Sequence, residues 1–421
     1  METNKKNNKR KIPLALKIVL IVIICLALVG AGFFAYIYSM LNKINRPDPN
    51  EAYITEEELN EIEKADAENE TEEGDFFEVI LDEDEELWDP NAENSEENTE
   101  TSSGSETQSD SETGENTGNN NSTEQTESSE TENSSGKSSG TSSSSSSSET
   151  TTKVDTSRVI SPDQIQFNPL DNPTITGKHL INILLIGQDR KQYEATRQRS
   201  DSMILATINK DKKTITLTSF VRDIYVQIPG YKNNRLNAAF RFGGMKLLDQ
   251  TFEKNFGVKI DANVCVDFGQ FIKVIDKLGG IDIEITDAEA EVLSLGSSGM
   301  RHFNGSLALA YARIRKIDSD IKRSERQRKV LLAVYGKYKD KSVTDLLSVM
   351  DELLPLITTD LSNMEILSFA MDLLPMSKDF TIFTQRVPIN KSYYYDTIDG
   401  RALTIIDFKK NQQFLIDTLL D

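Results

Sequence analysis

An uncharged apolar run near the N-terminus constrains this chain more than any other feature. Residues 18–38 read "IVLIVIICLALVGAGFFAYIY", close to the roughly 20 residues that a helix needs to cross the hydrocarbon core of a bilayer. Six Lys and Arg precede the run, and only Lys43 and Arg46 follow it closely. Because positive charge favours the cytoplasmic side, we expect residues 1–17 in the cytoplasm, a transmembrane signal-anchor at 18–38 in the cell membrane, and an extracellular remainder. A cleaved signal peptide is the alternative, although its apolar region is normally about 7–15 residues long.

The segment after this run is strongly acidic and rich in Ser, Thr, Glu and Asn. Residues 51–157 hold 33 Asp and Glu against three Lys. Such a composition buries too little apolar surface to offset the entropy lost on folding. We therefore predict that residues 39–157 form a disordered extracellular linker. A linker of this length would let a folded domain stand away from the membrane.

Residues 158–421 are nearly neutral, with 36 basic and 33 acidic residues. Their most basic stretch is "YARIRKIDSDIKRSERQRK" at 311–329, in which eight of nineteen residues are Lys or Arg. In a cytoplasmic protein, such a stretch would suggest nucleic-acid binding. Export, the lack of helix-turn-helix spacing and the lack of interleaved aromatic residues argue against a nucleic-acid partner.

The pattern of residues 158–421 predicts strands interleaved with helices. Apolar runs at 181–186, 203–208 and 214–219 are typical of short strands. Helical spacing of apolar residues follows at 243–257 and 268–278, and Asn304 is a plausible N-cap for a further helix. Alternation of the two element types indicates an α/β fold, an α-β-α sandwich with a central mixed sheet.

Charged residues cluster at the ends of the first three predicted strands. If these strands are antiparallel neighbours, the end of the first, the start of the second and the end of the third meet at one rim. That rim would bring together Asp189, Arg199, Asp201, Arg222 and Asp223. Carboxylates and guanidiniums in one place favour a shared Mg²⁺ and phosphate site. The alternative is that these groups are solvated or paired with each other, with Asp223 in an Asx-turn.

The helical phase of residues 320–335 divides the basic stretch. Arg323 and Gln327 lie one turn apart and continue onto the apolar stripe of the helix, so we expect them to point inward. Arg328 and Lys329 are expected at the surface. An arginine that points inward needs an anion, either an acidic side chain or a ligand phosphate.

Several stretches occurring in order resemble the LytR-CpsA-Psr family of cell-wall glycopolymer ligases. They include "NILLIGQDR", "RSDSMILATIN", "SFVRDIYVQIPGY", "RLNAAFRFGG", "HFNGSLALAYARIRK" and "DIKRSERQR". The resemblance identifies residues 158–421 as the catalytic domain of such an enzyme. In this family the matching residues bind Mg²⁺ and the diphosphate of a polyprenyl lipid.

The resemblance assigns roles to nine residues. It implies that Asp189 and Asp201 hold Mg²⁺ and that the diphosphate is bound by Arg199, Arg222, Arg313 and Arg315, with Asp320, Arg323 and Gln327 as further matches in the substrate site. Arg222 would be catalytic, and Asp189 is a candidate general base. The expected reaction moves a glycopolymer, such as teichoic acid or capsule, from polyprenyl diphosphate to a peptidoglycan sugar hydroxyl. Three alternatives remain: a non-catalytic polyprenyl-phosphate binder, a membrane-linked regulator, and a phosphatase that acts on the lipid-linked glycan.

Overall fold

The computed structural model describes residues 35–48, 53–55, 58, 161–189, 197–315, 317–376, 378–398 and 401–420. The predicted cytoplasmic tail, residues 18–34 of the apolar run and residues 59–157 of the acidic segment lie outside the described residues. Among the helices of the described part of the chain, none combines the length and the apolar character that a bilayer crossing requires.

A six-stranded mixed sheet forms the centre of the domain, in the order β10-β3-β2-β1-β6-β9. The pairs β1–β2, β2–β3 and β6–β9 are antiparallel, whereas β1–β6 and β3–β10 are parallel. The predicted α/β class with a central mixed sheet is confirmed, and so is the antiparallel order of the first three strands. The strands are β1 (Leu180–Gln188), β2 (Ser200–Asn209), β3 (Thr214–Phe220), β6 (Ala262–Asp267), β9 (Thr358–Thr359) and β10 (Thr381–Val387).

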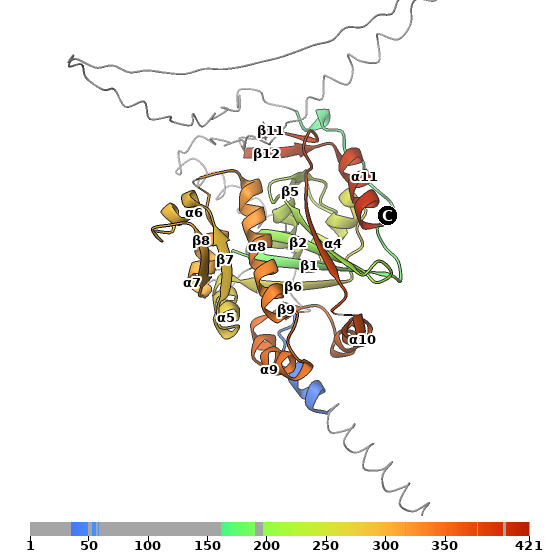
Figure 1. Cartoon of the computed structure of the whole chain (residues 1–421). Coiled ribbons are helices and arrows are strands. Elements are labelled where there is room, and N and C mark those ends of the chain that lie inside the picture. Colours follow the sequence, from blue (N-terminus) through green and yellow to red (C-terminus); the bar gives the residue numbers. More distant parts are fainter. Residues whose placement is uncertain are drawn as a thin grey trace, which may run out of the picture. The chain divides into compact units, whose positions relative to one another are not determined.

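Helices cover both faces of this sheet. The apolar side chains of β2 point alternately to one face and to the other, so both faces have apolar side chains to bury. Met203 and Leu205 face a core shared with α4 and α11, whereas Ile204 and Ala206 face the side that α8 covers. Figure 1 shows α8 crossing one face of the sheet. The helices are α4 (Leu236–Phe256), α5 (Phe268–Lys277), α6 (Asp287–Val292), α7 (Gly305–Ala312), α8 (Asp320–Tyr338), α9 (Val343–Leu353), α10 (Asn363–Leu373) and α11 (Phe408–Leu419).

A second apolar cluster lies beside the sheet. It joins α5, α7 and α8 to the hairpin β7–β8 through buried side chains such as Phe303, Tyr311 and Val330. Asn304 caps α7 as predicted, because its side chain accepts a hydrogen bond of 2.9 Å from the Leu307 backbone N–H. The three two-stranded hairpins are β4 (Tyr225–Val226) with β5 (Asn234–Arg235), β7 (Ile281–Ile285) with β8 (Gly299–Phe303), and β11 (Tyr393–Ile398) with β12 (Arg401–Ile406).

The segment that leaves the apolar run is part of the folded domain. Residues 35–41 form a helix whose Met40 and Leu41 are buried with Leu354 of the 3₁₀ turn that follows α9. Asn45 then forms a parallel bridge with Thr358 and so continues the central sheet beyond β9. Residues 39–48, which the sequence places in the disordered linker, instead pack against the domain.

Two further attachment points lie on opposite sides of the acidic segment. The Ile54 N–H donates to the Phe242 carbonyl at 2.9 Å, and the Tyr231 hydroxyl donates to the Ile54 carbonyl at 2.8 Å. On the far side of the segment, Ile165 is buried against Tyr225. Tyr225 lies in β4 and Tyr231 in the loop between β4 and β5. The chain therefore contacts the same hairpin before and after the acidic segment.

Candidate active site

Backbone pairing brings the predicted rim together. Gly187 pairs with Ser202, a bulge then places Gln188 opposite Ser200, and the Asp189 N–H donates to the Arg199 carbonyl at 3.2 Å. On the other side of β2, Ile204 pairs with Ser219, near the end of β3. The end of β1, the start of β2 and the end of β3 therefore meet at one rim, as predicted from the antiparallel order of these strands.

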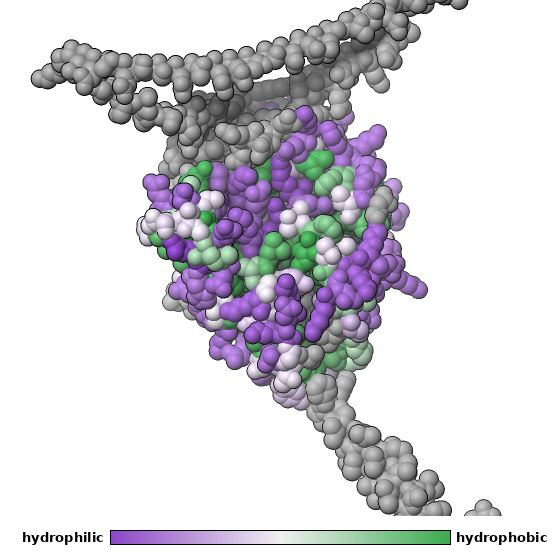
Figure 2. All heavy atoms as spheres, in the orientation of Figure 1, coloured by the Kyte–Doolittle hydropathy of each residue, from purple (hydrophilic) through white to green (hydrophobic). Residues whose placement is uncertain are grey.

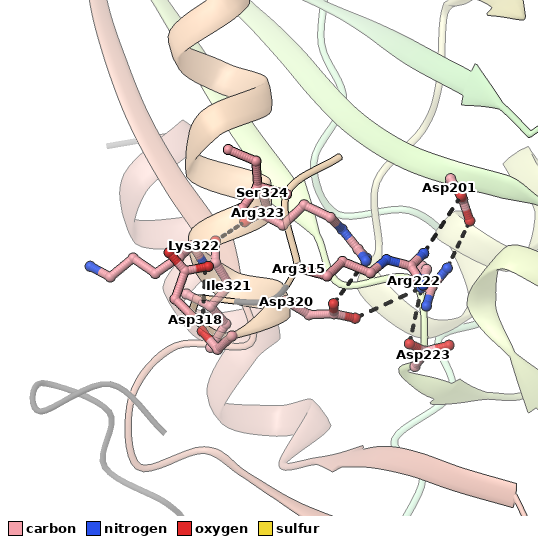
Figure 3. Close-up of polar contacts among 12 residues, drawn as sticks. Asp201, Arg222, Asp223, Arg315, Asp318, Asp320, Ile321, Lys322, Arg323 and Ser324 are labelled. Atoms are coloured by element: carbon pink, nitrogen blue, oxygen red, sulfur yellow. Dashed lines mark hydrogen bonds and ion pairs between the residues drawn. The ribbon is translucent and has the colours of Figure 1, made fainter. Parts of the chain in front are cut away.

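Arg222 is the electrostatic centre of this rim. Its Nη1 donates to Asp201 Oδ1 at 2.8 Å and its Nε to Asp223 Oδ2 at 3.1 Å. Asp320 Oδ2 lies 3.8 Å from the same Nε, and Figure 3 shows the three carboxylates arranged around this guanidinium. Burial alone would lower the pKa of Arg222, but the three carboxylates outweigh burial and raise it. Arg222 therefore stays charged and holds carboxylates from three different elements in place.

Asp223 lies in the turn of residues 221–224, but its carboxylate is buried and paired with arginine. Its carboxylate contacts Arg222 and lies 3.5 Å from the Nε of Arg235. Burial would raise the pKa of Asp223, but Arg222, Arg235 and Arg323 together lower it. Sequence reasoning did not identify Arg235, because nothing in the pattern shows that β5 lies beside the rim.

The first turn of α8 adds Asp320 and Arg323. Ser319 caps the helix, and Arg323 Nη1 lies 2.8 Å from Asp320 Oδ1, one turn back. Burial, together with the charges of Arg222 and Arg315 and against the opposing pull of Asp320, lowers the pKa of Arg323 to about 10. Burial is the largest cause of this lowered pKa, and a bound anion would oppose it by favouring the charged form of Arg323.

Arg313 and Arg315 are the least constrained of these cations. Both are exposed and follow directly after α7 ends at Ala312. The Arg313 guanidinium lies 4.4 Å above the ring centre of Phe268, a cation–π distance. Arg315 Nη2 is 3.9 Å from Asp201 Oδ2, too far for a hydrogen bond. These two guanidiniums keep most of their donors available for an anionic ligand.

A cavity of about 250 Å³ opens at these arginines. Its walls come from β1, β2, β6, α5, α7 and α8, and they are mostly aliphatic or aromatic, for example Leu185, Val264, Phe271, Leu309, Leu331 and Val334. Its polar lining includes Asp201, Arg313, Arg315, Arg323 and Gln327. Gln327 is held in place by the Ser202 hydroxyl, which donates to its Oε1 at 2.9 Å. An apolar cavity with cations at one end suits an amphiphile that has an anionic head.

The expectation that Arg328 lies at the surface is wrong. Arg328 is buried, and its Nη1 donates to Ser219 Oγ of β3 at 2.6 Å. α8 packs against the sheet on one side and against the β7–β8 block on the other. The single apolar stripe read from the sequence therefore underestimates how much of the surface of α8 is buried by its neighbours. Arg323 is buried as predicted, Gln327 lines the cavity, and Lys329 is exposed.

Arg326 was also missed, and its role is structural. It is buried, and both of its terminal nitrogens lie 2.6 Å from the Asp318 carboxylate oxygens. Its Nη2 also donates to the Ile314 carbonyl at 2.9 Å. These bonds tie α8 to residues 314–318 and so set the position of the loop that carries Arg315.

The carboxylates suit Mg²⁺ only if a substrate supplies further ligands. Asp189 and Asp201 lie on adjoining strand ends, and two carboxylates completed by water and phosphate oxygens make a normal magnesium ligand set. Within the described residues, no three Asp, Glu, His or Cys side chains are grouped so that they could hold a metal ion. The donor set therefore fits a metal that arrives with a phosphate-bearing substrate.

A sequence profile described as the LytR_cpsA_psr family matches residues 131–415, more than half of the chain. The chain belongs to the LytR-CpsA-Psr family. This membership confirms the resemblance drawn from the motifs around Asp189, Arg222 and Arg313.

Among curated LytR-CpsA-Psr relatives, the chain is similar to the polyisoprenyl-teichoic acid–peptidoglycan teichoic acid transferase TagT of Bacillus subtilis (strain 168). The two are 32% identical over 179 residues, which cover 39% of this chain and 55% of TagT. The chain thus spans about half the length of the first curated relatives it matches. The regulatory protein MsrR of Staphylococcus aureus (strain Mu50) is 32% identical over 263 residues, 60% of this chain and 77% of MsrR.

Solved structures of the family are also similar to this chain. One of them, TagT bound to LI-WTA, is 27% identical, with a TM-score of 0.48 over 58% of this chain and 92% of that one.

Proposed function

We propose that this protein is a membrane-anchored extracellular phosphotransferase. It moves a glycopolymer from polyprenyl diphosphate to a sugar hydroxyl of peptidoglycan and forms a phosphodiester. The observation that carries the proposal is the apolar cavity with Arg313, Arg315 and Arg323 on its lining. A polyprenyl diphosphate is an apolar chain with two adjacent negative groups, and this site complements both parts. The similar protein TagT is a polyisoprenyl-teichoic acid–peptidoglycan teichoic acid transferase, which supports the same reaction class.

The arginines divide the work according to their contacts. Arg313 and Arg315, the exposed pair, bind the diphosphate through parallel N–H donors. Arg323 adds a buried positive charge that stabilises the negative charge growing on the leaving phosphate. Arg222 has its Nε and Nη1 committed to the carboxylates of Asp223 and Asp201, so it acts mainly by holding Asp201 in position. Arg199, just before β2, and Gln327 of α8 complete the substrate site.

The transfer is one displacement at phosphorus. The acceptor hydroxyl oxygen bonds to the phosphorus on the glycan side while the bond from that phosphorus to the bridging oxygen breaks. Polyprenyl phosphate leaves with that oxygen, and the hydroxyl proton passes to a carboxylate, for which Asp189 is the candidate. Mg²⁺, held through Asp189 and Asp201, would neutralise diphosphate charge. The rest of the catalysis is positioning and electrostatics.

The location of the enzyme follows from its N-terminal sequence. Residues 18–38 anchor the chain in the cell membrane, the N-terminus is cytoplasmic, and the domain lies outside, where peptidoglycan is available. The name of the relative MsrR, a regulatory protein, favours a second candidate, a non-catalytic binder or regulator that uses the same cavity.

One assay separates these functions. The full chain, purified in detergent with Mg²⁺, is given a polyprenyl-diphosphate glycan with and without peptidoglycan fragments. Transfer predicts polyprenyl phosphate and a glycan–peptidoglycan phosphodiester only when the acceptor is present. Release of polyprenyl phosphate and glycan phosphate without an acceptor would indicate a phosphatase, with water in place of the sugar hydroxyl. Saturable binding of the lipid without any product would indicate a binder and would refute the transferase.

A further inference from the structure

Exposed apolar side chains gather at one end of the domain, next to the predicted membrane anchor. Nine large apolar side chains are exposed among the described residues, and five of them lie on the helix at 35–41, on α9 and on α10. Figure 2 shows hydrophobic side chains at the lower end of the view, in the region of α10. The five are Tyr36, Tyr38, Met350, Met364 and Met371, and they are called the apolar end below.

The helix α10 is unusually apolar for a helix at a surface. Its sequence is "NMEILSFAMDL", yet none of its residues is buried. Met364 is 59% exposed and Met371 is 70% exposed. These two are seven residues apart, so they lie on the same face of the helix. Ile366 and Leu367 pack against the domain, so the exposed side of α10 carries the two methionines together with Glu365, Ser368 and Asp372. Exposed methionines among polar residues in this way mark a contact surface.

The apolar end is fixed to the segment that emerges from the apolar run. Lys43 Nζ forms an ion pair of 2.6 Å with Asp351, in the last turn of α9. Arg46 Nη2 donates to Asn363 Oδ1, at the start of α10, at 2.7 Å. Backbone hydrogen bonds run from the Asn45 N–H to Ile357 and from the Thr359 N–H to Asn45. These contacts attach residues 43–46, which follow the helix at 35–41, directly to α9, α10 and the residues between them.

The course of the chain identifies what covers this surface. The uncharged run of residues 18–38 ends inside the helix of residues 35–41, so Tyr36 and Tyr38 mark the point where the chain would leave the bilayer. Tyrosine is enriched at that level of a membrane. Tyr38 and Met364 line one groove between this helix and α10. Whatever surrounds the emerging tyrosines therefore also reaches α10.

We propose that the apolar end, with α10 at its centre, rests on the outer lipid surface of the membrane. This holds the domain directly on the bilayer in a fixed orientation. The inference rests on the membrane anchor given under Proposed function, but not on the transferase chemistry.

Tryptophan quenching by brominated lipid tests this contact. The full chain carries Trp88 as its one tryptophan, so the background variant is Trp88→Phe. On that background, Met371→Trp probes α10. Met300→Trp is the matched control, because Met300 is 63% exposed and lies on β8, outside the apolar end. Each variant is reconstituted in phosphatidylcholine vesicles with or without bromine on the upper acyl chain.

The proposal predicts blue-shifted emission for Met371→Trp and a loss of intensity in brominated vesicles, with neither change for Met300→Trp. Equal, unquenched emission from both variants would overturn it. Quenching of both would show unspecific adsorption and would also overturn it. A blue shift of Met371→Trp without quenching would mean that protein, such as a second copy of the chain, covers α10.

Failure of this proposal is distinguishable from failure of the transferase. The fluorescence is measured without donor or acceptor, so an inactive protein would still show the quenching. Flotation of the same vesicles shows whether the chain is anchored. A chain that does not float with lipid would refute the anchor and, with it, the lipid contact.

Discussion

Arg222 Nη1 lies 2.8 Å from Asp201 Oδ1, and this contact joins an arginine at the end of β3 to a carboxylate of β2. The other oxygen of Asp201 faces Arg315, at 3.9 Å. The same carboxylate thus lies between a half-buried arginine with three acidic neighbours and an exposed arginine with few contacts. Substitutions at these two arginines should therefore have different consequences.

Arg222→Ala should destabilise the fold as well as abolish transfer. The substitution leaves Asp201, Asp223 and Asp320 close together without their shared counter-ion. Breaking a buried ion pair costs about 3–5 kcal/mol, and because the Arg222 side chain is 18% exposed, we expect a loss below that range. Denaturant unfolding of the full chain in detergent measures the loss. Arg222→Lys keeps the charge and should recover part of the stability. An Arg222→Ala protein as stable as the wild type would contradict this role.

Arg315→Ala should weaken diphosphate binding without affecting the fold. The Arg315 side chain is 53% exposed, and an exposed substitution of this kind changes stability by about 0.5 kcal/mol or less. A lost hydrogen bond to a charged group costs about 1.5–3 kcal/mol, or roughly 10- to 150-fold in affinity. Calorimetric titration with a short-chain polyprenyl diphosphate measures this effect. Lys329→Ala, at an exposed position on α8, is the control and should bind as the wild type does.

A larger side chain inside the cavity should weaken the binding of donors with long lipid tails more than that of donors with short tails. Val334 lines the cavity from α8, so Val334→Trp should displace the tail while the arginines remain. Each buried methylene contributes about 0.8 kcal/mol, so the preference for a long over a short polyprenyl diphosphate should fall steeply. Val334→Ala enlarges the same space and should keep the preference. The ratio of the two affinities is the readout, and an unchanged ratio in Val334→Trp would place the tail elsewhere.

A half-buried carboxyl on α4, Asp249, should make stability depend on pH. Burial, together with the nearby Asp360 and Glu253 and against hydrogen bonds from Asn263, raises the pKa of Asp249 to about 8. The folded chain keeps this proton where the unfolded chain has lost it. The contribution of Asp249 to the free energy of unfolding is therefore at its full value below about pH 4. It decreases as pH rises to about 8, by at most about 1.4 kcal/mol per pH unit.

Asp249→Asn should remove that pH dependence and keep an acceptor for Asn263, which donates to both Asp249 oxygens at 3.1 Å. Urea unfolding at pH 5, 7 and 8.5 compares the two chains. The free energy of unfolding of the variant, relative to wild type, should increase with pH. Curves that stay parallel across this range would mean that Asp249 is already ionised in the fold.

The local part of this structure could be predicted from sequence. Strands β1, β2 and β3 follow from short apolar runs and polar turns, and the convergence of Asp201 with Arg222 follows from their antiparallel order. The N-cap of α7, Asn304, could be predicted because capping depends only on residues that are neighbours in the sequence. These features depend on contacts that are close in sequence.

Features that depend on distant contacts could not be predicted in the same way. Arg328 is buried because β3 supplies Ser219, 109 residues away. The two-residue strand β9 exists because it pairs with β6, and no propensity signals a strand that short. Residues 39–48 look like the start of a polar linker, yet they are ordered by α9, α10 and β9.

The contacts of Ile54 and Ile165 with one hairpin, through Tyr231 and Tyr225, change what the acidic segment can do. A stretch that starts and ends on the same folded body is an insertion, so it cannot act as a spacer between that body and the bilayer. Lengthening such a closed insertion is thermodynamically inexpensive, about 0.6 kcal/mol for each doubling. The length of this insertion can therefore change at little cost in stability, while the site keeps its place on the folded domain.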